Sequence, residues 1–443
     1  MFSQRSKREA VGNKIEVMKT AIVWFKTDLR LTDNETFLQA IASSDQVIPV
    51  YVWDERLFNE TSYGTQKTGA FRKRFLVESL IDLDQRLRSK GSGLMLLKGD
   101  PEVELPKLAH AYHVHKVFAK REVAFEEKQS ITEVEKALWK VGCELEVYST
   151  STLFRADDLP FSIKQIPEVF TTFRTKVEKD SFVRELMAEP DQVKSPTILK
   201  AEWELPEITY DDRAAIVFEG GETAALKRLN DYLFVSKSIT SYKQTRNELI
   251  GADYSSKFSA WLAQGCLSPK TIYHEVKRFE QEHGANESTY WLIFELIWRD
   301  FFRFLFKKHN QRFFYLKGIK AVYPNQVIHN EQLFEKWKQG ETDNDFINAN
   351  MKELNATGFM SNRGRQLVAS YFCYELQLDW RLGAAYFEEQ LIDYDVSSNW
   401  GNWAYIAGVG NDPRGGRAFD IEKQTLQYDK NATYRKLWLE TFN

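Results

Sequence analysis

Four short segments in the second half of the sequence carry side chains that can bind a polar, planar ligand. The first is YKQTRN at 242–247, followed by DYSSKFS at 253–259, where hydroxyl groups and a lysine precede an expected helix. Free N–H groups at a helix start, with hydroxyls and a cation beside them, suit a diphosphate. An ordinary serine N-cap with a solvated lysine would have the same composition, so the segment alone leaves both readings open.

The second segment is WLIFELIWRDFFR at 291–303, which is expected to be helical. Helical spacing brings Glu295, Trp298, Arg299 and Phe302 onto one face. A carboxylate, an indole and a guanidinium on one stripe would form a stacking platform with polar handles for a base or a flavin. The alternative is a core face that carries a simple Glu295–Arg299 helix pair.

The third and fourth segments, GFMSNRGR at 358–365 and DYDVSSNWGNWAY at 393–405, mix amides and carboxylates with aromatic rings. Each buried polar group must find a partner, so the density of the fourth segment favours a bound ligand over a plain core. We expect no metal, because the three cysteines form no CxxC pair and the seven histidines lack ligand spacing, apart from His110, His113 and His115, which we expect to be solvated. The sequence has no GxSxG, P-loop or HExxH motif, and no GxGxxG follows its first expected strand.

The elements that must position these segments follow from hydrophobic periodicity. Between residues 20 and 149, short apolar runs alternate with helical patterns, as at 71–87, which Gly91 is expected to end. This alternation predicts a doubly wound parallel sheet in a domain spanning 19–150. The expected strands are the apolar runs at 21–25, 47–52, 94–97, 116–118 and 145–148.

The remaining chain divides into three parts. Residues 151–215 are rich in proline and poor in periodicity, which predicts a long connector. Strand signals are missing from 216–443, and helix starts such as Ser268-Pro269 predict an all-helical domain. Residues 1–18 would be either a disordered leader or the result of an upstream start site.

Composition excludes several classes of protein. The 443 residues carry a net charge of −3, so no general basic field indicates a nucleic-acid partner, and any such surface must be local. No apolar run approaches the roughly 18 residues of a membrane span, and residues 1–18 lack the apolar centre of a signal peptide. We therefore expect a cytoplasmic protein, one that keeps its cysteines reduced.

Taken together, the segments resemble the photolyase and cryptochrome flavoproteins, most closely the cryptochrome DASH branch. The resemblance runs from about Lys19 to the C-terminus and rests on WFKTDLR at 24–30, on the four segments above and on AGVGNDPR at 407–414. It implies an α/β plus all-α protein. An N-terminal antenna domain would precede a helical domain that holds FAD non-covalently in a folded conformation.

The resemblance also implies roles for individual residues. Asn399 would lie beside flavin N5, and Arg365 would pair with Asp393 and favour an anionic reduced ring. The positions matching the phosphate-binding stretch are Tyr242, Ser255, Ser256, Lys257, Phe258 and Ser259. The flavin-facing positions are Asn362, Arg365, Asp393, Asp395 and Asn399. The positions that hold a flipped pyrimidine dimer in relatives are Glu295, Trp298, Arg299, Asn362 and Tyr405, and we expect the chemistry to depend on Glu295, Asn362, Asn399 and Tyr405.

The implied activity is that of a deoxyribodipyrimidine photolyase, in which photoexcited FADH⁻ lends an electron to a cyclobutane pyrimidine dimer. Tyr405 stands where double-strand photolyases carry Trp, so single-stranded DNA is the expected substrate. We expect the protein to be a monomer. The alternative is a blue-light photoreceptor that signals through the flavin redox state. The chain ends at Asn443, soon after the flavin domain, whereas signalling relatives usually carry a long tail. Repair of (6-4) photoproducts is disfavoured, because Ser361 stands where that class has His.

Two further expectations concern electrons and light. Trp403 and Trp380 match the first two members of the family's photoreduction chain, but the third position is Val327, which cannot carry an electron hole. Tyr323, Trp337 or another aromatic residue would have to replace it. DASH relatives commonly bind methenyltetrahydrofolate as an antenna. Its candidate contacts here are Glu122 and Glu127, which would otherwise be ordinary solvated helix glutamates.

Overall fold

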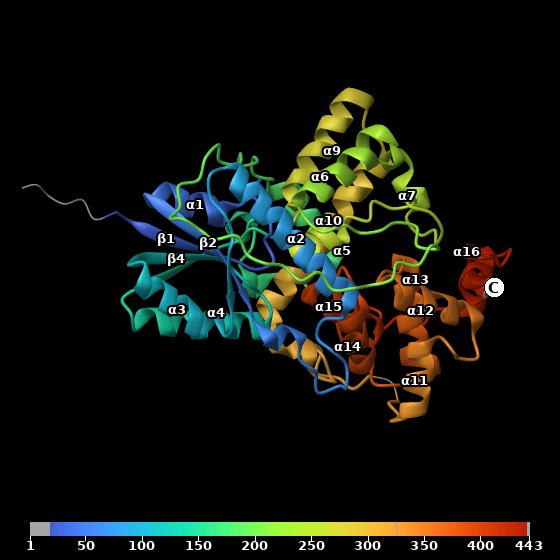
Figure 1. The fold of residues 1–443 in the computed structure, drawn as a ribbon. Helices are drawn as coiled ribbons and strands as arrows, with labels where there is room; N and C mark the ends of the chain where they lie inside the picture. The colour runs from blue at the N-terminus through green and yellow to red at the C-terminus, as the bar shows by residue number, and fades with distance from the viewer. Residues whose placement is uncertain (1–17, 325, 441–443) are drawn as a thin grey trace, which may run out of the picture.

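A computed structural model describes residues 18–324 and 326–440, which fold into a sheet domain followed by a helical domain (Figure 1). The expected leader at 1–18 lies, apart from Met18, outside the described residues. The fold class expected from the sequence, α/β followed by all-α, is confirmed.

The sheet of the first domain has five strands, all paired in parallel, in the order β3-β2-β1-β4-β5. β1 is buried along its whole length, and its side chains alternate between two cores. Val23 and Phe25 pack into the core shared with the helical domain, whereas Ile22 and Trp24 pack into a separate core under α3 and α4. Burial on both faces explains why this strand is continuously apolar. The strands are β1 (Thr20–Phe25), β2 (Gln46–Trp53), β3 (Met95–Lys98), β4 (Val114–Lys120) and β5 (Glu144–Tyr148).

Helices connect these strands. The clearest expected helix is α2, which ends at Ser89, and Gly91 follows with a φ of 88° that suits glycine. The connector after β5 is less irregular than its composition suggests, because apolar residues at helical spacing form α5 within it. The helices of this part are α1 (Glu35–Ser43), α2 (Ala70–Ser89), α3 (Pro101–Ala111), α4 (Phe125–Trp139) and α5 (Phe170–Asp180).

Among the described residues from 216 onward, the regular structure is helical. Ser268 caps α9 as expected, and Asn286 and Thr289 form a capping box at the start of α10. The helices are α6 (Glu222–Asn230), α7 (Tyr242–Thr245), α8 (Ser259–Gln264), α9 (Pro269–His283), α10 (Glu287–His309), α11 (Glu331–Gln339), α12 (Asp345–Thr357), α13 (Asn362–Ser370), α14 (Trp380–Gln390), α15 (Val396–Ile406), α16 (Ile421–Tyr428) and α17 (Thr433–Leu439).

Shorter helical segments complete the chain. Two are π-helical turns that directly continue α6 and α13, a feature often found near functional sites. They are η4 (Asp231–Val235) and η7 (Tyr371–Glu375). The 3₁₀ segments are η1 (Glu55–Phe58), η2 (Ala156–Asp158), η3 (Ile163–Gln165), η5 (Ser238–Ser241) and η6 (Asn310–Phe314).

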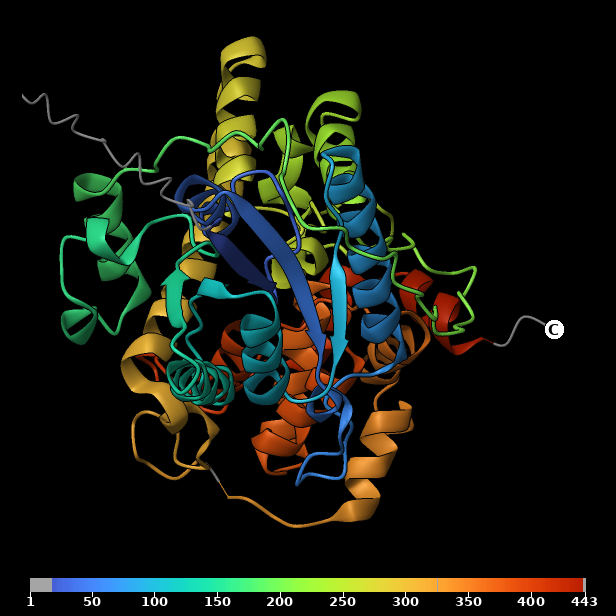
Figure 2. The same ribbon diagram turned by 60° about the vertical axis from the view of Figure 1, so that its left-hand side comes forward.

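The two domains are joined through buried polar contacts at the end of β1. The carboxylate of Glu222 accepts hydrogen bonds from the backbone N–H groups of Leu31 and Thr32 at 2.7 and 3.0 Å, and Arg30 donates to the Gly265 carbonyl at 2.9 Å. Figure 2 shows the sheet lying against the helical domain, with α2 alongside. The loop after β1 therefore supports the segment that leads into α9.

No helix among the described residues has the length and apolar character needed to cross a membrane.

Candidate functional site

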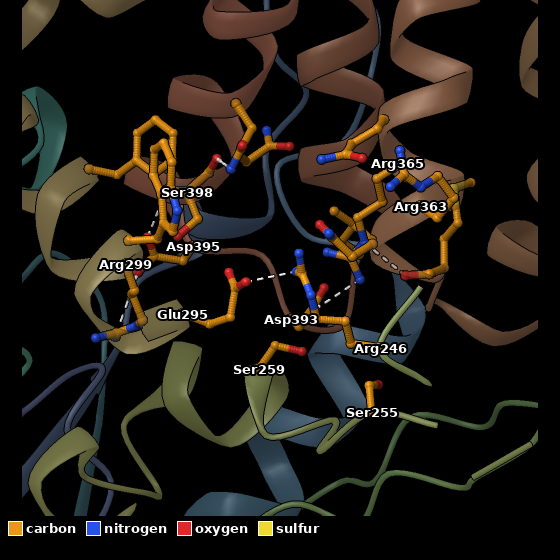
Figure 3. A pocket seen from close by; sticks show the side chains of 18 of the residues that line it. Arg246, Ser255, Ser259, Glu295, Arg299, Arg363, Arg365, Asp393, Asp395 and Ser398 are labelled. Carbon is orange, nitrogen blue, oxygen red and sulfur yellow. Dashed lines mark hydrogen bonds and ion pairs between the residues drawn. The ribbon is translucent and has the colours of Figure 1, made fainter. Parts of the chain in front are cut away.

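One large cavity, of about 480 Å³, opens in the helical domain (Figure 3). Its volume falls in the range of roughly 300–1,000 Å³ that is usual for ligand pockets. All four segments singled out in the sequence contribute to its wall. The expected site residues that line it are Tyr242, Ser255, Ser256, Lys257, Phe258, Ser259, Glu295, Trp298, Arg299, Asn362, Arg365, Asp393, Asp395, Asn399, Trp403 and Tyr405.

The segment before α8 presents a buried, unpaired cation. Lys257 has left-handed backbone geometry, with a φ of 56°, and is only 4% exposed. Its Nζ lies 3.4 Å from the centre of the Tyr254 ring and has no hydrogen-bond partner among the described residues. Burial lowers the pKa of Lys257 to about 7. A solvated lysine beside a serine cap is therefore the wrong interpretation, since the amine is buried at the cavity wall.

Arg228 braces the same segment from α6. Its guanidinium donates hydrogen bonds to the carbonyls of Ala252, Ser255 and Ser256 at 3.2, 3.3 and 3.1 Å. These bonds fix the loop backbone, so Lys257 and the neighbouring hydroxyls keep their positions at the cavity wall.

The face of α10 offers a carboxylate beside aromatic rings. Glu295 does not pair with Arg299 as a simple helix pair would. Its carboxylate instead lies 2.7 Å from Arg246, an ion pair drawn in Figure 3. Burial raises the pKa of Glu295, and Arg246 opposes that shift. Trp298 stacks on Phe170 with ring centres 3.6 Å apart, which holds its indole as one wall of the cavity.

Arg299 serves a different purpose. Its guanidinium donates to the carbonyls of Leu262 and Ser151, so it ties α10 to α8 and to the connector. Burial lowers its pKa to about 10. Arg299 therefore lines the cavity and also binds two backbone carbonyls of the protein.

Two carboxylates lie at the start of α15, each held by an arginine. Arg365 and Asp393 form the ion pair expected from the resemblance, at 2.9 Å. The second oxygen of Asp393 is buried, and no described residue donates a hydrogen bond to it. Burial acts to raise the pKa of Asp395, but Arg303 at 2.5 Å and then Arg299 outweigh it and hold that pKa near 2. The cavity therefore contains an ionised Asp395 and an Asp393 oxygen free to accept a hydrogen bond.

Asn399 and Trp403 follow on α15. The Asn399 amide donates to the Ala384 carbonyl at 2.9 Å, which fixes the orientation of its side chain. Trp403 packs on Gly383 of α14, where a Cβ would lie 2.3 Å from the indole ring. Glycine is required there because the ring takes the space of a side chain.

Trp380 is the first residue of α14 and does not line the cavity. Its indole is 1% exposed and donates to the Leu316 carbonyl at 3.1 Å. Val327 lies beside it, in the lining of a second, very small hollow.

The expected antenna residues lie outside the cavity. Glu122 is enclosed by Lys26 at 3.3 Å and Lys120 at 3.4 Å, so it is not a solvated glutamate. Burial, with Glu122 as the next cause, raises the pKa of Glu127 to about 7.

Several cavity residues were not among the expected ones. Arg246 lay within the first segment but was not assigned a role. Arg363, Arg417 and Phe419 also line the cavity, and Arg417 donates to the Tyr405 hydroxyl at 2.9 Å. Arg417 lies in an irregular segment, so hydrophobic periodicity could not have identified it. Within 18–324 and 326–440, no group of three or more acidic, histidine or cysteine side chains could hold a metal ion.

Comparisons with known proteins assign this architecture. Residues 21–194 match the family model of DNA photolyase, and residues 291–443 match the FAD binding domain of DNA photolyase. A relative named Cryptochrome DASH from Synechocystis sp. is 46% identical over 96% of this chain and 88% of its own length. Cryptochrome DASH, chloroplastic/mitochondrial, from Arabidopsis thaliana is 44% identical over 95% of this chain and 75% of its own length.

A solved structure gives the same result. The structure of a Synechocystis sp. PCC6803 cryptochrome superposes with a TM-score of 0.92 at 46% identity, covering 96% of this chain and 89% of that one.

The cavity fits the FAD that the matched domain implies. The unpaired amine of Lys257 and the free oxygen of Asp393 are both buried at its wall, and each would gain a partner from a diphosphate or a ring N–H. Trp403 and Asn399 would lie against the ring system. From its two matched domains and its likeness to relatives over nearly its whole length, the chain belongs to the photolyase and cryptochrome family, in the cryptochrome DASH branch.

Proposed function

We propose that this protein repairs cyclobutane pyrimidine dimers in single-stranded DNA with light. The observation that carries the proposal is the composition of the cavity. The expected flavin-facing residues and the expected dimer-binding residues line the same hollow, so donor and substrate would lie within one enclosed space. Membership in the family supports a DNA substrate.

The reduced flavin would supply one electron under blue light and take it back after the two bonds between the bases have broken. The protein's own residues hold the dimer. Charge develops on the pyrimidine carbonyl oxygens, and Glu295 can donate a hydrogen bond there when protonated, which its raised pKa favours. Arg246 competes for the same carboxylate, so binding of the dimer would weaken that ion pair.

Trp298 and Tyr405 form the aromatic walls. Their rings lie edge to face with centres 6.4 Å apart, which leaves two surfaces against which fused bases could pack. Extracting the dimer from a duplex costs a few kcal/mol of free energy in lost stacking and pairing. The phenol ring of Tyr405 covers less of the dimer than an indole would, so it offsets less of that cost. Single strands, where that cost is smallest, are therefore the proposed substrate.

The test uses reduced, FAD-loaded protein with oligonucleotides that carry one thymine dimer. We expect splitting under blue light in single strands, little in duplexes and none in the dark. Glu295→Ala, which removes the hydrogen-bond donor, should lower the yield in single strands while leaving flavin absorbance unchanged. If the loaded, reduced protein leaves single-stranded dimers intact, repair is not its function, and the photoreceptor alternative takes its place.

We propose methenyltetrahydrofolate as the antenna, with Glu127 as its contact. Glu122 is engaged by two lysines, whereas Glu127 has no cationic partner within 18–324 and 326–440 and carries a raised pKa, so it could donate to a pterin nitrogen. Reconstitution with the folate should add its near-ultraviolet absorbance. Glu127→Ala should lose that absorbance and Glu126→Ala, an exposed neighbour, should keep it. Equal binding by both variants contradicts the assignment.

We further propose that Trp403 and Trp380 carry electrons to the flavin during photoreduction. Trp403 lines the cavity, and its ring packs on Gly383, one turn of α14 after Trp380. Trp403→Phe should abolish light-driven flavin reduction, measured by loss of the oxidised flavin spectrum. Full photoreduction in that variant would refute the route.

A further inference from the structure

The proposed electron route lacks an obvious end. A hole on Trp380 is enclosed in protein, since that residue is 1% exposed, and its indole N–H points to the Leu316 carbonyl. A carbonyl cannot take up the indole proton, so the radical cation persists on Trp380. The electron on the flavin would then return to it, and the charge separation would be lost. Val327, in the position of the family's third tryptophan, has no redox chemistry to offer. The inference below rests on the proposed route through Trp403 and Trp380.

Trp400 lies next to Trp380 in a different chemical setting. The two indole rings meet edge to face, with centres 5.9 Å apart. The Trp400 N–H donates to the Glu388 carboxylate at 3.1 Å and to the Tyr394 hydroxyl at 3.2 Å. The ring of Tyr63, which is partly exposed, lies 6.2 Å from Trp400 on the side of the sheet domain.

The carboxylate is the decisive feature. Oxidation makes the indole N–H far more acidic, and a base on that N–H converts the radical cation into a neutral radical that no longer attracts the electron back. Burial raises the pKa of Glu388, so this carboxylate takes up a proton more readily than an exposed one. Trp400 is thus the one of the two neighbouring indoles that can trap the hole.

The other candidates fit less well. Tyr323 is exposed, but the Lys317 ammonium lies 4.0 Å from its ring centre and would oppose a positive hole. Trp337 lies 6.1 Å from Trp403, yet it is fully buried and its N–H is held by the Val368 carbonyl. Among the described residues, neither donates a hydrogen bond to a carboxylate as Trp400 does.

We propose that Trp400 is the terminal electron donor of flavin photoreduction and that Glu388 accepts its proton. One electron passes from Trp403 to the light-excited flavin. Trp380 then reduces the oxidised Trp403, and Trp400 reduces the oxidised Trp380. The indole proton of Trp400 moves to the Glu388 carboxylate. A thiol in solution then reduces the neutral radical through the Tyr63 side; Glu388 returns the proton to the indole, and the thiol releases its own proton as it becomes a thiyl radical.

Two variants test the two parts of the proposal in the FAD-loaded protein with a thiol present. Trp400→Phe should lose sustained light-driven flavin reduction. Glu388→Gln keeps the shape of the acceptor but removes the base, so transient absorption should show a tryptophan radical cation in place of the neutral radical, followed by fast recombination. Tyr323→Phe is the matched control and should behave as wild type.

A rescue variant separates electron transfer from damage to the fold. Val327→Trp restores an indole beside Trp380, and Trp400→Phe combined with Val327→Trp should regain photoreduction. Three results would each overturn the proposal. Trp400→Phe could photoreduce its flavin as wild type does, Glu388→Gln could still form the neutral radical, or light and thiol could fail to reduce the flavin of the wild-type protein.

Repair is measured separately, after chemical reduction with dithionite. All these variants should then split single-stranded dimers as wild type does, because the photoreduction route is bypassed. Loss of repair in chemically reduced wild-type protein would contradict the proposed function, whereas loss of photoreduction alone would contradict only the route.

Discussion

Two clusters of buried charge in this molecule are built in opposite ways. At the carboxyl ends of β1 and β4, Glu122 lies between Lys26 and Lys120, and the pKa of Glu122 is about 2 because those cations outweigh its burial. We call these three residues the ion cluster. At the cavity, the buried Lys257 has no hydrogen-bond partner, and its pKa falls to about 7. Charges are paired where they join elements, whereas the Lys257 amine has no partner among the described residues at the cavity where we propose that FAD binds.

The largest effect should come from breaking the ion cluster. Glu122→Gln removes the anion that lies between Lys26 and Lys120, of which Lys120 is only 2% exposed, and we expect a loss of about 3 kcal/mol in the free energy of unfolding. Urea unfolding measures it, and FAD affinity should stay unchanged because Glu122 lies outside the cavity. If FAD affinity falls while the free energy of unfolding stays unchanged, the ion cluster serves ligand binding and the assignment is wrong.

The opposite pattern is expected at the cavity. Lys257→Met should weaken FAD binding by roughly 10- to 100-fold, the value of a charge-assisted hydrogen bond, and should stabilise the FAD-free protein by about 2 kcal/mol. Flavin titration and urea unfolding give the two quantities. Lys243→Met is the control, since Lys243 pairs with Glu287 at the surface and should change neither. A destabilised FAD-free Lys257→Met protein would show that the amine serves the fold.

The pH dependence of stability sharpens the same contrast. An unfolded lysine holds its proton up to about pH 10.5, whereas the folded Lys257 releases it near pH 7. Between these values the unfolded chain binds more protons, so the unfolding free energy of the FAD-free protein should rise with pH. Lys120, with a pKa of about 8, adds to that slope. Urea unfolding at pH 7, 8 and 9 should give a shallower slope for Lys257→Met than for wild type, and identical slopes would contradict the assignment.

The smallest effect concerns substrate choice. Tyr405→Trp enlarges the aromatic wall, and we expect repair in duplex DNA to rise about threefold, which corresponds to roughly 0.6 kcal/mol of added stacking. Tyr405→Phe keeps the ring but removes the bond from Arg417, so it separates stacking from hydrogen bonding. Unchanged strand preference in Tyr405→Trp would mean that another residue limits access to duplexes.

Local patterns predicted much of the fold and part of the site. Periodicity and capping within about 20 residues of chain predicted the five strands and the cap of α9. They also predicted α2 and the glycine, Gly91, that follows its end. The helical face that carries Glu295 and Trp298 was equally predictable. The helix inside the connector was missed, because proline on either side hid the apolar spacing of Phe170, Phe173 and Val177.

Partners distant in sequence could not be read in this way. Glu295 pairs with Arg246, which lies 49 positions earlier, and not with Arg299 on its own helix. Trp400 contacts Tyr63 from the sheet domain, and Arg417 reaches Tyr405 from an irregular segment. No periodicity relates such residues, because their approach depends on how whole helices pack.

The sequence by itself determined which elements form and which residue types gather around the site, since hydrophobic spacing, caps and turn residues act over short stretches of chain. Only the tertiary structure decided which charges are compensated and which are left free. Burial and pairing depend on every element that surrounds a group. Lys120 is paired with Glu122, whereas Lys257, which has the same kind of side chain, has no hydrogen-bond partner among the described residues.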